Sequence, residues 1–595
     1  MELYFLISLF LSIPITSHSL NILFYVPTLS HSHISFNTKL AEVLTSYGHS
    51  VTVLLAQVDD TLLIENVTEY TVLRKKVGVP RGHLRQVLWS NPGPYEDSSP
   101  LNPHIFYKLL KVSRTFVTAC ENIAFDSLFL DSLKEQKFDV GLVEQYDSCG
   151  FGIFKAIGIE STVWLSATAI YRPQAEALGV YLPYSYVPVI NVLIGQATSF
   201  VLDVFVQGFQ SRIFNQDLAS ISKETSSIMI NSVPFFDYSM PSSHQFSNIG
   251  GITVDKKGTK KLDPYWQSIA DSAENGFVLV SFGGIARTID MTSSMQKIFF
   301  DSFSKFPHII FIVKYEFTSN STATMPDNVI LTPWIPQLPL MAHKNYKTII
   351  THGGWSSILE TTMHSKPMIL MPLFADHAKN SKVAESKGVA VLLDKMRLSQ
   401  RRVVHAINTI LTNPRYTQNC EKFSRMFSDT PIPHEDLIEW RIRQAAKPSR
   451  KAFARHLRPK EPDFSLLKIS FILVPAFLLN KVIHRIKRLC DNGKRERERE
   501  DNGNISKFQI SRMRRRNAFS IGFVRGYKMG NCYKMMAHGM SLVECKHTSN
   551  KTKSSIDCAL EIAFDWDRVS DEEDSEVEHL LLALSKEHSA PGKTV

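Results

Sequence analysis

Residues 21–56 read NILFYVPTLSHSHISFNTKLAEVLTSYGHSVTVLLA, and this stretch decides the fold class. Asn21 to Thr28 is an apolar run of strand length, Phe36 to Tyr47 has apolar residues at helical spacing, and Val51 to Ala56 is a second apolar run. Gly48 follows the helical segment, where glycine commonly ends a helix. A strand, a helix and a buried strand in succession predict a parallel α/β sheet.

Further apolar runs extend this sheet and start a second one. In the first sheet they are Phe138 to Val143, Thr162 to Leu165 and Ser227 to Asn231. In the second they are Phe277 to Phe282, His308 to Lys314, Asn328 to Thr332, Thr348 to Thr351, Met368 to Met371 and Val389 to Leu393, with a helix at Met295 to Phe306. We therefore predict two Rossmann-like domains, residues 20–252 and 264–447, that face a cleft at their strand ends.

The composition is that of a globular protein that is too long for one core. Of its 595 residues, 44% are hydrophobic and 21% charged, and the net charge is +10. Much of the basic excess lies from Lys481 onward, in runs such as 494–499 and 512–516. The charge therefore says little about the folded domains, and we expect no nucleic-acid partner.

Both ends of the chain carry apolar segments. Residues 1–19 resemble a signal peptide with an apolar run from Tyr4 to Ile15, although the start has no basic residue and a buried first strand is the alternative. Residues 464–483 are long enough to form a transmembrane helix, and an amphipathic surface helix is the alternative. Basic residues after it would place the tail, 484–595, in the cytoplasm, and its mixed charge predicts disorder.

The seven cysteines are irregularly spaced and form no metal-binding pattern. We therefore expect no metal site. One disulfide can form, but the spacing does not assign its partners. Asn66-Val67-Thr68 and Asn320-Ser321-Thr322 are glycosylation sequons that require a lumenal location.

Candidate binding residues gather between residues 334 and 377. This stretch contains Trp334-Ile335-Pro336-Gln337, Thr351-His352-Gly353-Gly354-Trp355-Ser356-Ser357, Glu360 and Asp376-His377. An earlier strand ends at Gly283. Each residue alone is commonly a core, loop or solvated residue. Together they can hold a uracil ring, a ribose, a diphosphate and a sugar.

The chemistry of the side chains suits these parts. Trp334 offers a flat face for uracil, and Gln337 can read the edge of the base through its amide. His352 and the backbone N–H groups of Gly354, Ser356 and Ser357 lie where a helix follows a strand, a position that favours a diphosphate.

Carboxylates complete the candidate donor site. Glu360 can accept hydrogen bonds from both ribose hydroxyls, and Asp376 can do the same for the sugar. His377 follows Asp376 directly and completes the candidate set.

Residues 334–377 resemble the signature of the UDP-glycosyltransferases, and the nearest branch is the membrane-bound animal UDP-glucuronosyltransferases. The resemblance runs from about Asn21 to Ile483 and includes Ile230-Asn231-Ser232, Asn248-Ile249-Gly250-Gly251 and Ser281-Phe282-Gly283. It implies the glycosyltransferase type B fold. It also implies a single-pass protein of the endoplasmic reticulum membrane with lumenal catalytic domains, and it leaves a homo-oligomer open.

The resemblance implies that His33 takes the proton of the acceptor hydroxyl. Imidazole suits this role because its ordinary pKa lies near neutral pH. The family partner of this histidine is usually an aspartate, and this chain has Glu144 at that place. His31 competes for the same role, and its spacing to the following helix favours His33.

The implied reaction is an inverting transfer of a sugar to a hydroxyl group of a small lipophilic molecule. A UDP-sugar is the co-substrate, no cofactor is expected, and the membrane is an expected partner. The alternative is a catalytically silent family member that binds a ligand or a partner subunit, although such a protein would more often lose His33 or Glu144.

Three residues depart from the family pattern. Ser356 stands where asparagine is frequent, Gly284 where serine is frequent, and His377 where glutamine usually follows the aspartate. Because His377 stands at the sugar position, the donor stays open between UDP-glucuronate and UDP-glucose.

Overall fold

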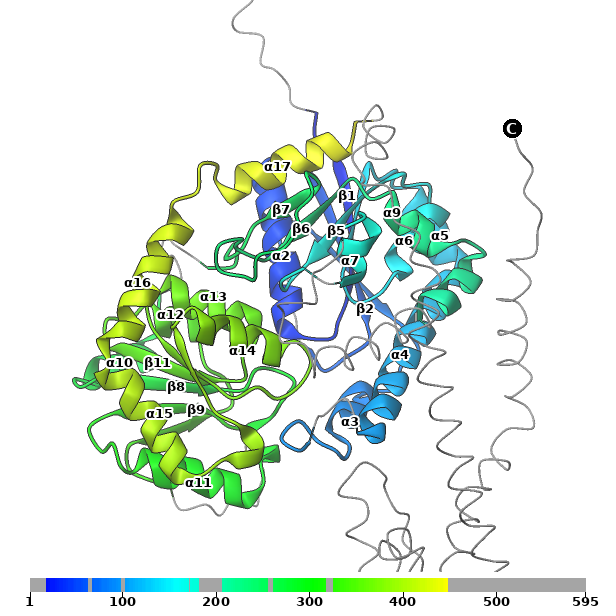
Figure 1. Ribbon diagram of the computed structural model, residues 1–595. Helices are drawn as coiled ribbons and strands as arrows, with labels where there is room; N and C mark the ends of the chain where they lie inside the picture. The colour runs from blue at the N-terminus through cyan, green and yellow to red at the C-terminus, as the bar shows by residue number, and fades with distance from the viewer. Residues whose placement is uncertain are drawn as a thin grey trace, which may run out of the picture. The chain divides into compact units, whose positions relative to one another are not determined.

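Two parallel β-sheets form the framework of the computed structural model (Figure 1). The structure describes residues 18–62, 67–97, 102–170, 172–180, 206–254, 261–316 and 325–447. Both sheets belong to one compact unit. The predicted α/β class with two Rossmann-like sheets is confirmed.

The N-terminal half carries a seven-stranded sheet in the order β3-β2-β1-β4-β5-β6-β7. Its elements are β1 (Asn21–Pro27), α2 (His31–Ser46), β2 (Ser50–Gln57), β3 (Thr71–Lys76), α3 (His83–Trp89), α4 (Pro103–Ala124), α5 (Ser127–Lys134), β4 (Val140–Glu144), α6 (Cys149–Ala156), β5 (Ser161–Ser166), α7 (Arg172–Ala177), α9 (Leu218–Lys223), β6 (Ser227–Ile230) and β7 (Phe246–Asn248). In register, Ile22 of β1 lies between Val51 of β2 and Val140 of β4.

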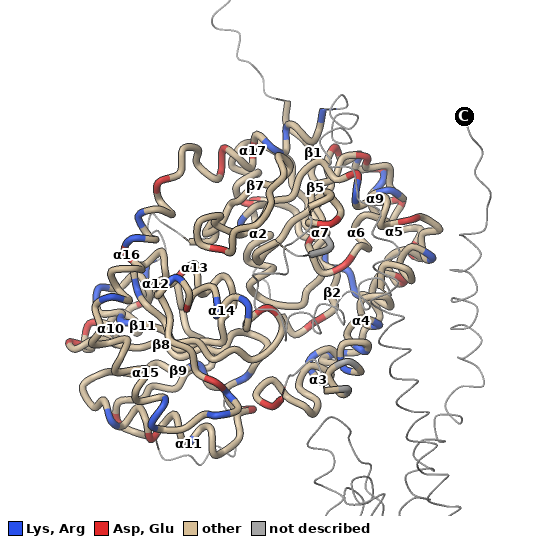
Figure 2. Tube along the Cα trace, in the orientation of Figure 1, with Lys and Arg blue, Asp and Glu red and all other residues tan. Residues whose placement is uncertain are grey.

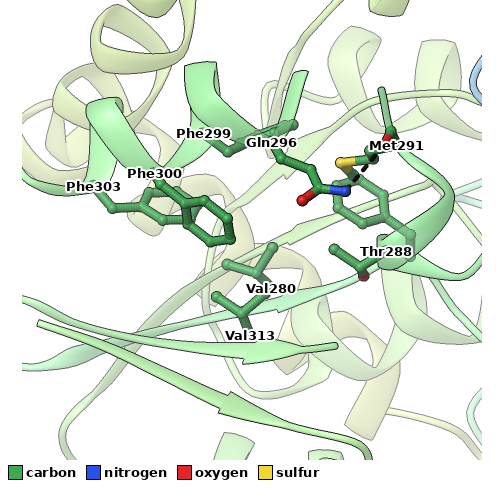
Figure 3. Close-up of a pocket in the computed structure, with 9 residues that line it drawn as sticks. Val280, Thr288, Met291, Gln296, Phe299, Phe300, Phe303 and Val313 are labelled. Carbon is green, nitrogen blue, oxygen red and sulfur yellow. Dashed lines mark hydrogen bonds between the residues drawn. The ribbon is translucent and has the colours of Figure 1, made fainter. Parts of the chain in front are cut away.

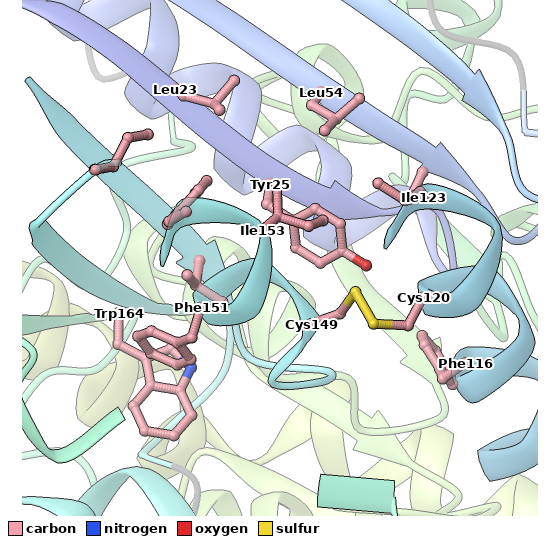
Figure 4. Close-up of a cluster of buried hydrophobic side chains, with 14 of the residues drawn as sticks. Leu23, Tyr25, Leu54, Phe116, Cys120, Ile123, Cys149, Phe151, Ile153 and Trp164 are labelled. Carbon is pink, nitrogen blue, oxygen red and sulfur yellow. A yellow bond between two sulfur atoms is a disulfide. The ribbon is translucent and has the colours of Figure 1, made fainter. Parts of the chain in front are cut away.

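Successive side chains of β1 point to opposite faces of the sheet, so the N-terminal half has one core cluster on each face. Leu23 and Tyr25 belong to the cluster shown in Figure 4, while Ile22, Phe24 and Val26 belong to the cluster that packs under α2. All five side chains are fully buried. A central strand that is apolar on both faces is what the continuous run in the sequence requires.

The predicted strands of this half are confirmed with small shifts at their ends, but one helix and two further strands differ from the prediction. Helix α2 begins at His31 rather than Phe36, because Ser30 is extended (φ −142°) and the chain turns into the helix directly after it. Strands β3 and β7 were missed. β3 is a partly exposed edge strand that contains Arg74, Lys75 and Lys76, and β7 is only three residues long, so neither forms an apolar run.

A disulfide joins two helices over the face of the sheet opposite α2. Cys120 of α4 and Cys149 of α6 are bonded with their Cα atoms 5.7 Å apart, and both are fully buried (Figure 4). The cysteine spacing alone did not assign this pair. Cys420 is a buried free thiol.

The C-terminal half carries a six-stranded sheet in the order β10-β9-β8-β11-β12-β13. Its elements are α10 (Pro264–Ser272), β8 (Phe277–Ser281), η1 (Thr288–Asp290), α11 (Ser293–Phe303), β9 (Ile310–Lys314), β10 (Val329–Thr332), α12 (Gln337–Met341), β11 (Tyr346–Thr351), α13 (Trp355–Met363), β12 (Met368–Leu370), α14 (His377–Ser386), β13 (Ala390–Leu392), η2 (Lys395–Arg397), α15 (Gln400–Thr412), α16 (Pro414–Ser428) and α17 (His434–Ala445). The strands predicted here are confirmed.

Helix α17 returns to the N-terminal half, although the sequence assigned residues 264–447 to the C-terminal domain. Ile438 and Ile442 are fully buried in the core cluster that contains β1 and α2. Nε2 of His49 lies 2.7 Å from the Glu439 carboxylate. The chain crosses over between α16 and α17, and Pro433 occupies the N-cap position of α17.

Several predicted segments lie outside the described residues. They are nearly all of the signal peptide 1–19, the membrane helix 464–483, the tail 484–595 and both sequon asparagines. Among the residues that the structure describes, no helix is both long and apolar enough to span a membrane.

Candidate functional site

Candidate residues of both halves lie where the strand order of each sheet reverses direction. In the N-terminal sheet this point is between β1 and β4, and in the C-terminal sheet it is between β8 and β11. His33 follows β1 and Glu144 ends β4, while Gly283 follows β8 and His352 follows β11. Open α/β sheets bind ligands at such points because the loops there diverge and leave a crevice.

His33 and Glu144 form a buried pair. Nδ1 of His33 lies 2.6 Å from Oε1 of Glu144, and the other carboxylate oxygen accepts a hydrogen bond from the Tyr146 N–H at 3.1 Å. The Tyr146 ring stacks on the imidazole with centroids 4.2 Å apart. The carboxylate and the stacked ring together hold the imidazole in one orientation.

The structure distinguishes the two histidines at the start of α2. His33 is 7% exposed, and the Asn37 amide donates to its carbonyl. Within the described residues no hydrogen bond reaches its Nε2. His31 is exposed and lies edge-on to the Trp334 ring at 5.2 Å. Of the two, His33 is the histidine that lies within hydrogen-bond distance of Glu144.

The start of α13 presents backbone N–H groups at the end of β11. Gly354 is the N-cap and supplies no side chain, so the first-turn N–H groups of Trp355, Ser356 and Ser357 have no partner within the helix. The Trp355 indole donates to the carbonyl of Asn231 in the N-terminal half. This bond anchors the start of α13 against the other sheet.

His352 is packed between two glycines. A Cβ on Gly283, which has φ +87°, would lie 2.8 Å from Cε1 of His352, and a Cβ on Gly354 would lie 2.6 Å from its Nε2. Desolvation of the ring lowers the pKa of His352 well below its ordinary value, and neighbouring His377 lowers it further. At neutral pH the ring is therefore a neutral hydrogen-bonding group rather than a cation.

His377 is buried and also neutral. Its ring meets that of His352 edge-on at 4.5 Å, and its Nδ1 accepts a hydrogen bond from the Phe374 N–H at 3.3 Å. Nε2 therefore carries the hydrogen. Burial, together with the charge of Lys395, lowers the pKa of His377 to about 3.

Asp376 caps α14, and the Asn380 amide donates to its carboxylate at 2.7 Å. The same amide donates to the Gly353 carbonyl at 3.2 Å. Ala375, just before Asp376, has φ +52°, which is unfavourable for a residue with a Cβ. The loop that presents Asp376 and His377 is thus held in a strained conformation.

The residues predicted to bind the uracil and the ribose are Trp334, Gln337 and Glu360. The Trp334 side chain is 55% exposed. The Gln337 amide donates to Oε2 of Glu360 at 2.7 Å and to the Ser357 hydroxyl at 3.3 Å. Burial raises the pKa of Glu360 to about 7, and the bond from Gln337 opposes this shift. Gln337 therefore lies beside the carboxylate predicted to bind ribose.

The sequence model of one protein family, UDP-glucoronosyl and UDP-glucosyl transferase, matches residues 22–491. The chain belongs to this family. It is therefore a glycosyltransferase that uses a UDP-sugar, and the resemblance found in residues 334–377 is confirmed.

Relatives support the same assignment. The candidate UDP-glucuronosyltransferase ugt-60 of Caenorhabditis elegans is 28% identical over 78% of this chain and 97% of its own length. UDP-glucuronosyltransferase 1A1 of Homo sapiens is 25% identical over 79% of this chain and 90% of its own length.

Solved structures show the fold. The glycotransferase of kitacinnamycin aligns with a TM-score of 0.51 at 14% identity, over 71% of this chain and 99% of that one. Os79 from O. sativa, in complex with U2F and trichothecene, aligns with a TM-score of 0.50 at 15% identity, over 71% and 99%. The type B glycosyltransferase architecture is therefore confirmed.

Sequence reasoning missed three residues at the site of this glycosyltransferase. Tyr146 follows Glu144 by two positions, and Asn380 lies one helical turn after Asp376. That spacing could have indicated Asn380. The backbone strain at Ala375 has no signal in the sequence.

A small apolar cavity lies elsewhere in the C-terminal half, beneath α11 (Figure 3). Its lining includes Val280, Phe299, Phe300 and Val313, and none of the candidate site residues borders it. Within the described ranges, no group of His, Cys, Asp and Glu could hold a metal ion. Figure 2 shows basic and acidic residues mixed over both halves.

Proposed function

We propose that this protein transfers a sugar from a UDP-sugar to a hydroxyl group of a small lipophilic acceptor, with inversion at the anomeric carbon. The buried His33–Glu144 pair at 2.6 Å is the observation that carries the proposal. One contact supports its placement opposite the donor residues. The ring of His31, two residues before His33, lies edge-on to the ring of Trp334.

In the proposed reaction, Glu144 accepts the hydrogen bond from Nδ1–H of His33, which leaves Nε2 as the base. Nε2 takes the proton of the acceptor hydroxyl while its oxygen attacks the anomeric carbon. The bond from that carbon to the phosphate oxygen breaks, and UDP leaves with the electron pair. A single displacement inverts the configuration. Glu144 then stabilises the imidazolium.

The departing diphosphate gains negative charge, and the start of α13 is placed to stabilise it. The N–H groups of Ser356 and Ser357 and the positive end of the helix favour an anion there. Neutral His352 can donate one hydrogen bond. These groups are fixed before the reaction, so they need little reorganisation as charge develops.

Donor binding follows from the remaining residues. We assign the uracil to the exposed face of Trp334, and the ribose hydroxyls to Glu360 with Gln337 beside it. Asp376 and the Nε2–H of His377 would contact the sugar. Because His377 supplies only a hydrogen-bond donor, it can bind either a hydroxyl of glucose or the carboxylate of glucuronate.

We also propose that the catalytic halves face the lumen of the endoplasmic reticulum, anchored by residues 464–483. The Cys120–Cys149 disulfide supports this location, because such bonds persist in oxidising compartments. Glycosidase sensitivity of the protein made in cells tests it: a shift in mobility is expected, and loss of the shift in Asn66→Gln/Asn320→Gln is the control. A protein that carries no glycan and stays fully protease-accessible in sealed microsomes would contradict it.

The experiment that tests the function is a donor-by-acceptor screen on microsomes that contain the protein. UDP-glucuronate and UDP-glucose are each offered with a panel of lipophilic alcohols and phenols, and the conjugate is detected by mass. We expect a conjugate that disappears in His33→Ala and persists in His31→Ala. Transfer by His33→Ala at the wild-type rate would refute the assignment of the base. Binding of UDP without transfer to any acceptor would indicate a catalytically silent member.

A further inference from the structure

A segment of the N-terminal half, residues 89–96, makes close contacts with the C-terminal half. We call it the strap. Trp89, the last residue of α3, donates from its indole to the Ile285 carbonyl at 2.6 Å, and the Arg287 guanidinium lies 3.6 Å from its ring centre. In Figure 1 the loop after α3 reaches toward the C-terminal half. The first residue of the strap therefore contacts the loop that follows β8.

The strap ends inside the C-terminal core. Tyr95 is 4% exposed, belongs to the hydrophobic cluster around β8 and meets Phe282 edge-on at 5.9 Å. Lys108 of α4 fixes the strap from the other side, because its ammonium donates to the carbonyls of Leu88, Ser90 and Pro92 at 2.7, 2.9 and 2.7 Å. Through these contacts the strap joins the two halves.

One buried side chain links the strap to the donor-sugar loop. Nζ of Lys395 donates to the Pro94 carbonyl of the strap at 3.0 Å and to the Leu373 carbonyl at 2.6 Å. Leu373 begins the strained loop that leads to Asp376 and His377. Lys395 is only 9% exposed.

The cost of burying the Lys395 ammonium must be offset by favourable contacts. Desolvation of a charge is unfavourable, and an apolar side chain of similar volume usually packs into a core at lower cost. A leucine or methionine at position 395 could fill the space but could not bond to carbonyls of both halves. The ammonium of Lys395 bonds to a carbonyl of each half, Pro94 and Leu373.

We propose that Lys395 is a positioning residue that ties the Asp376–His377 loop to the strap and so sets the donor sugar relative to His33. This inference rests on the proposed transfer reaction. Base and sugar come from different halves, so their distance depends on contacts between the halves. A misplacement of about 1 Å can lower a rate by about 100-fold.

The protonation state of Lys395 allows a second test, the dependence of activity on pH. Burial lowers its pKa to about 8, while Asp97, Asp394 and Glu96 act in the opposite direction and Lys108 adds to the lowering. His377 also lies nearby and is neutral. Above about pH 8 the ammonium loses its proton, and its hydrogen bonds to the two carbonyls lose the contribution of the charge.

The test compares Lys395→Met, Lys395→Arg and a matched control, Lys382→Met, which removes an exposed lysine of α14. Steady-state kinetics are measured with the UDP-sugar used by the wild type and an aliphatic alcohol acceptor, which does not itself titrate between pH 6 and 9.5. UDP binding is measured by calorimetry. Amide exchange is followed in residues 88–97.

For Lys395→Met we expect kcat/KM for the UDP-sugar to fall at least about tenfold, the low end of a positioning error. UDP binding should stay within about threefold, and residues 88–97 should exchange faster. The wild type should lose activity above about pH 8, and whatever activity Lys395→Arg retains should lack that fall, because guanidinium stays charged. Lys382→Met should match the wild type.

Three results would overturn the inference. One is a wild-type kcat/KM in Lys395→Met. Another is a loss of UDP binding as large as the loss of turnover, which would indicate general damage to the C-terminal half. The third is an alkaline fall that is unchanged in Lys395→Arg. By contrast, a wild-type protein that transfers no sugar would refute the proposed function itself.

Discussion

Replacing Glu144 by glutamine should nearly abolish transfer without disturbing donor binding. The carboxylate accepts from His33 Nδ1 through one oxygen and from the Tyr146 N–H through the other. Glutamine has a single acceptor oxygen, so its NH₂ group must face one of these two donors. If it faces His33, the imidazole takes the tautomer with hydrogen on Nε2, which cannot accept a proton.

The magnitude follows from the charge that develops during the reaction. His33 becomes an imidazolium only as it takes the acceptor proton, so Glu144 stabilises the transition state more than the ground state. Unit charges with centres about 4 Å apart attract by about 4 kcal/mol at an effective dielectric constant of about 20. At about 1.4 kcal/mol for each factor of ten, the expected loss in kcat is about 1,000-fold.

The assay is initial-rate kinetics with saturating UDP-sugar, alongside calorimetric binding of UDP. Glu144→Asp is the matched control, because it keeps the charge and shortens the side chain by one methylene. We expect it to retain far more activity than Glu144→Gln, and both variants to bind UDP as the wild type does. If folded Glu144→Gln keeps its kcat within about threefold, the pair is not the proton acceptor.

Three further predictions concern the donor site. A Cβ on Gly283 would collide with His352, so Gly283→Ala should weaken UDP binding by at least about 1 kcal/mol in calorimetry, whereas Gly284→Ala, whose Cβ has no neighbour nearer than 4.0 Å, should not. Trp334→Ala should raise the Kd for UDP by roughly 10- to 100-fold through lost stacking, with Trp334→Phe intermediate; equal Kd values would place uracil elsewhere. Burial raises the pKa of Glu360 from 4.5 to about 7. Between these pH values the carboxyl is protonated in the unliganded native state and ionised in the unfolded state. Unfolding free energy should therefore fall between about pH 5 and pH 7.5, by at most about 3 kcal/mol, and thermal unfolding of Glu360→Gln should show a smaller fall.

Much of the fold could be predicted because its strands are buried on both faces. Strands such as β1 and β8 have uninterrupted apolar sequences, since helices cover both sides of a parallel sheet. β3 and β7 escaped prediction because an edge strand and a three-residue strand need no such run. The early start of α2 escaped because the residues from His31 to Ser35 are mostly polar and show no helical periodicity.

The candidate site, too, could be predicted only in part from the sequence. Residues 334–377 lie close together in the chain, so their spacing could be compared with that of a family. The crossing of α17 back to the N-terminal half could not be foreseen, because its apolar face would suit either core. The Cys120–Cys149 pair could not be assigned either, since three pairings are open to the three cysteines of the described residues.

The sequence by itself determined that the protein has two parallel α/β sheets and a UDP-sugar motif, because strand burial and local spacing are properties of short stretches of chain. Tertiary structure alone decided which histidine is paired with Glu144, that His352 and His377 are neutral, and that Lys395 joins the halves. Each of these depends on groups far apart in the chain and on how much water the fold removes around them. Hydrogen-bond partners and pKa values are set by that environment rather than by residue type.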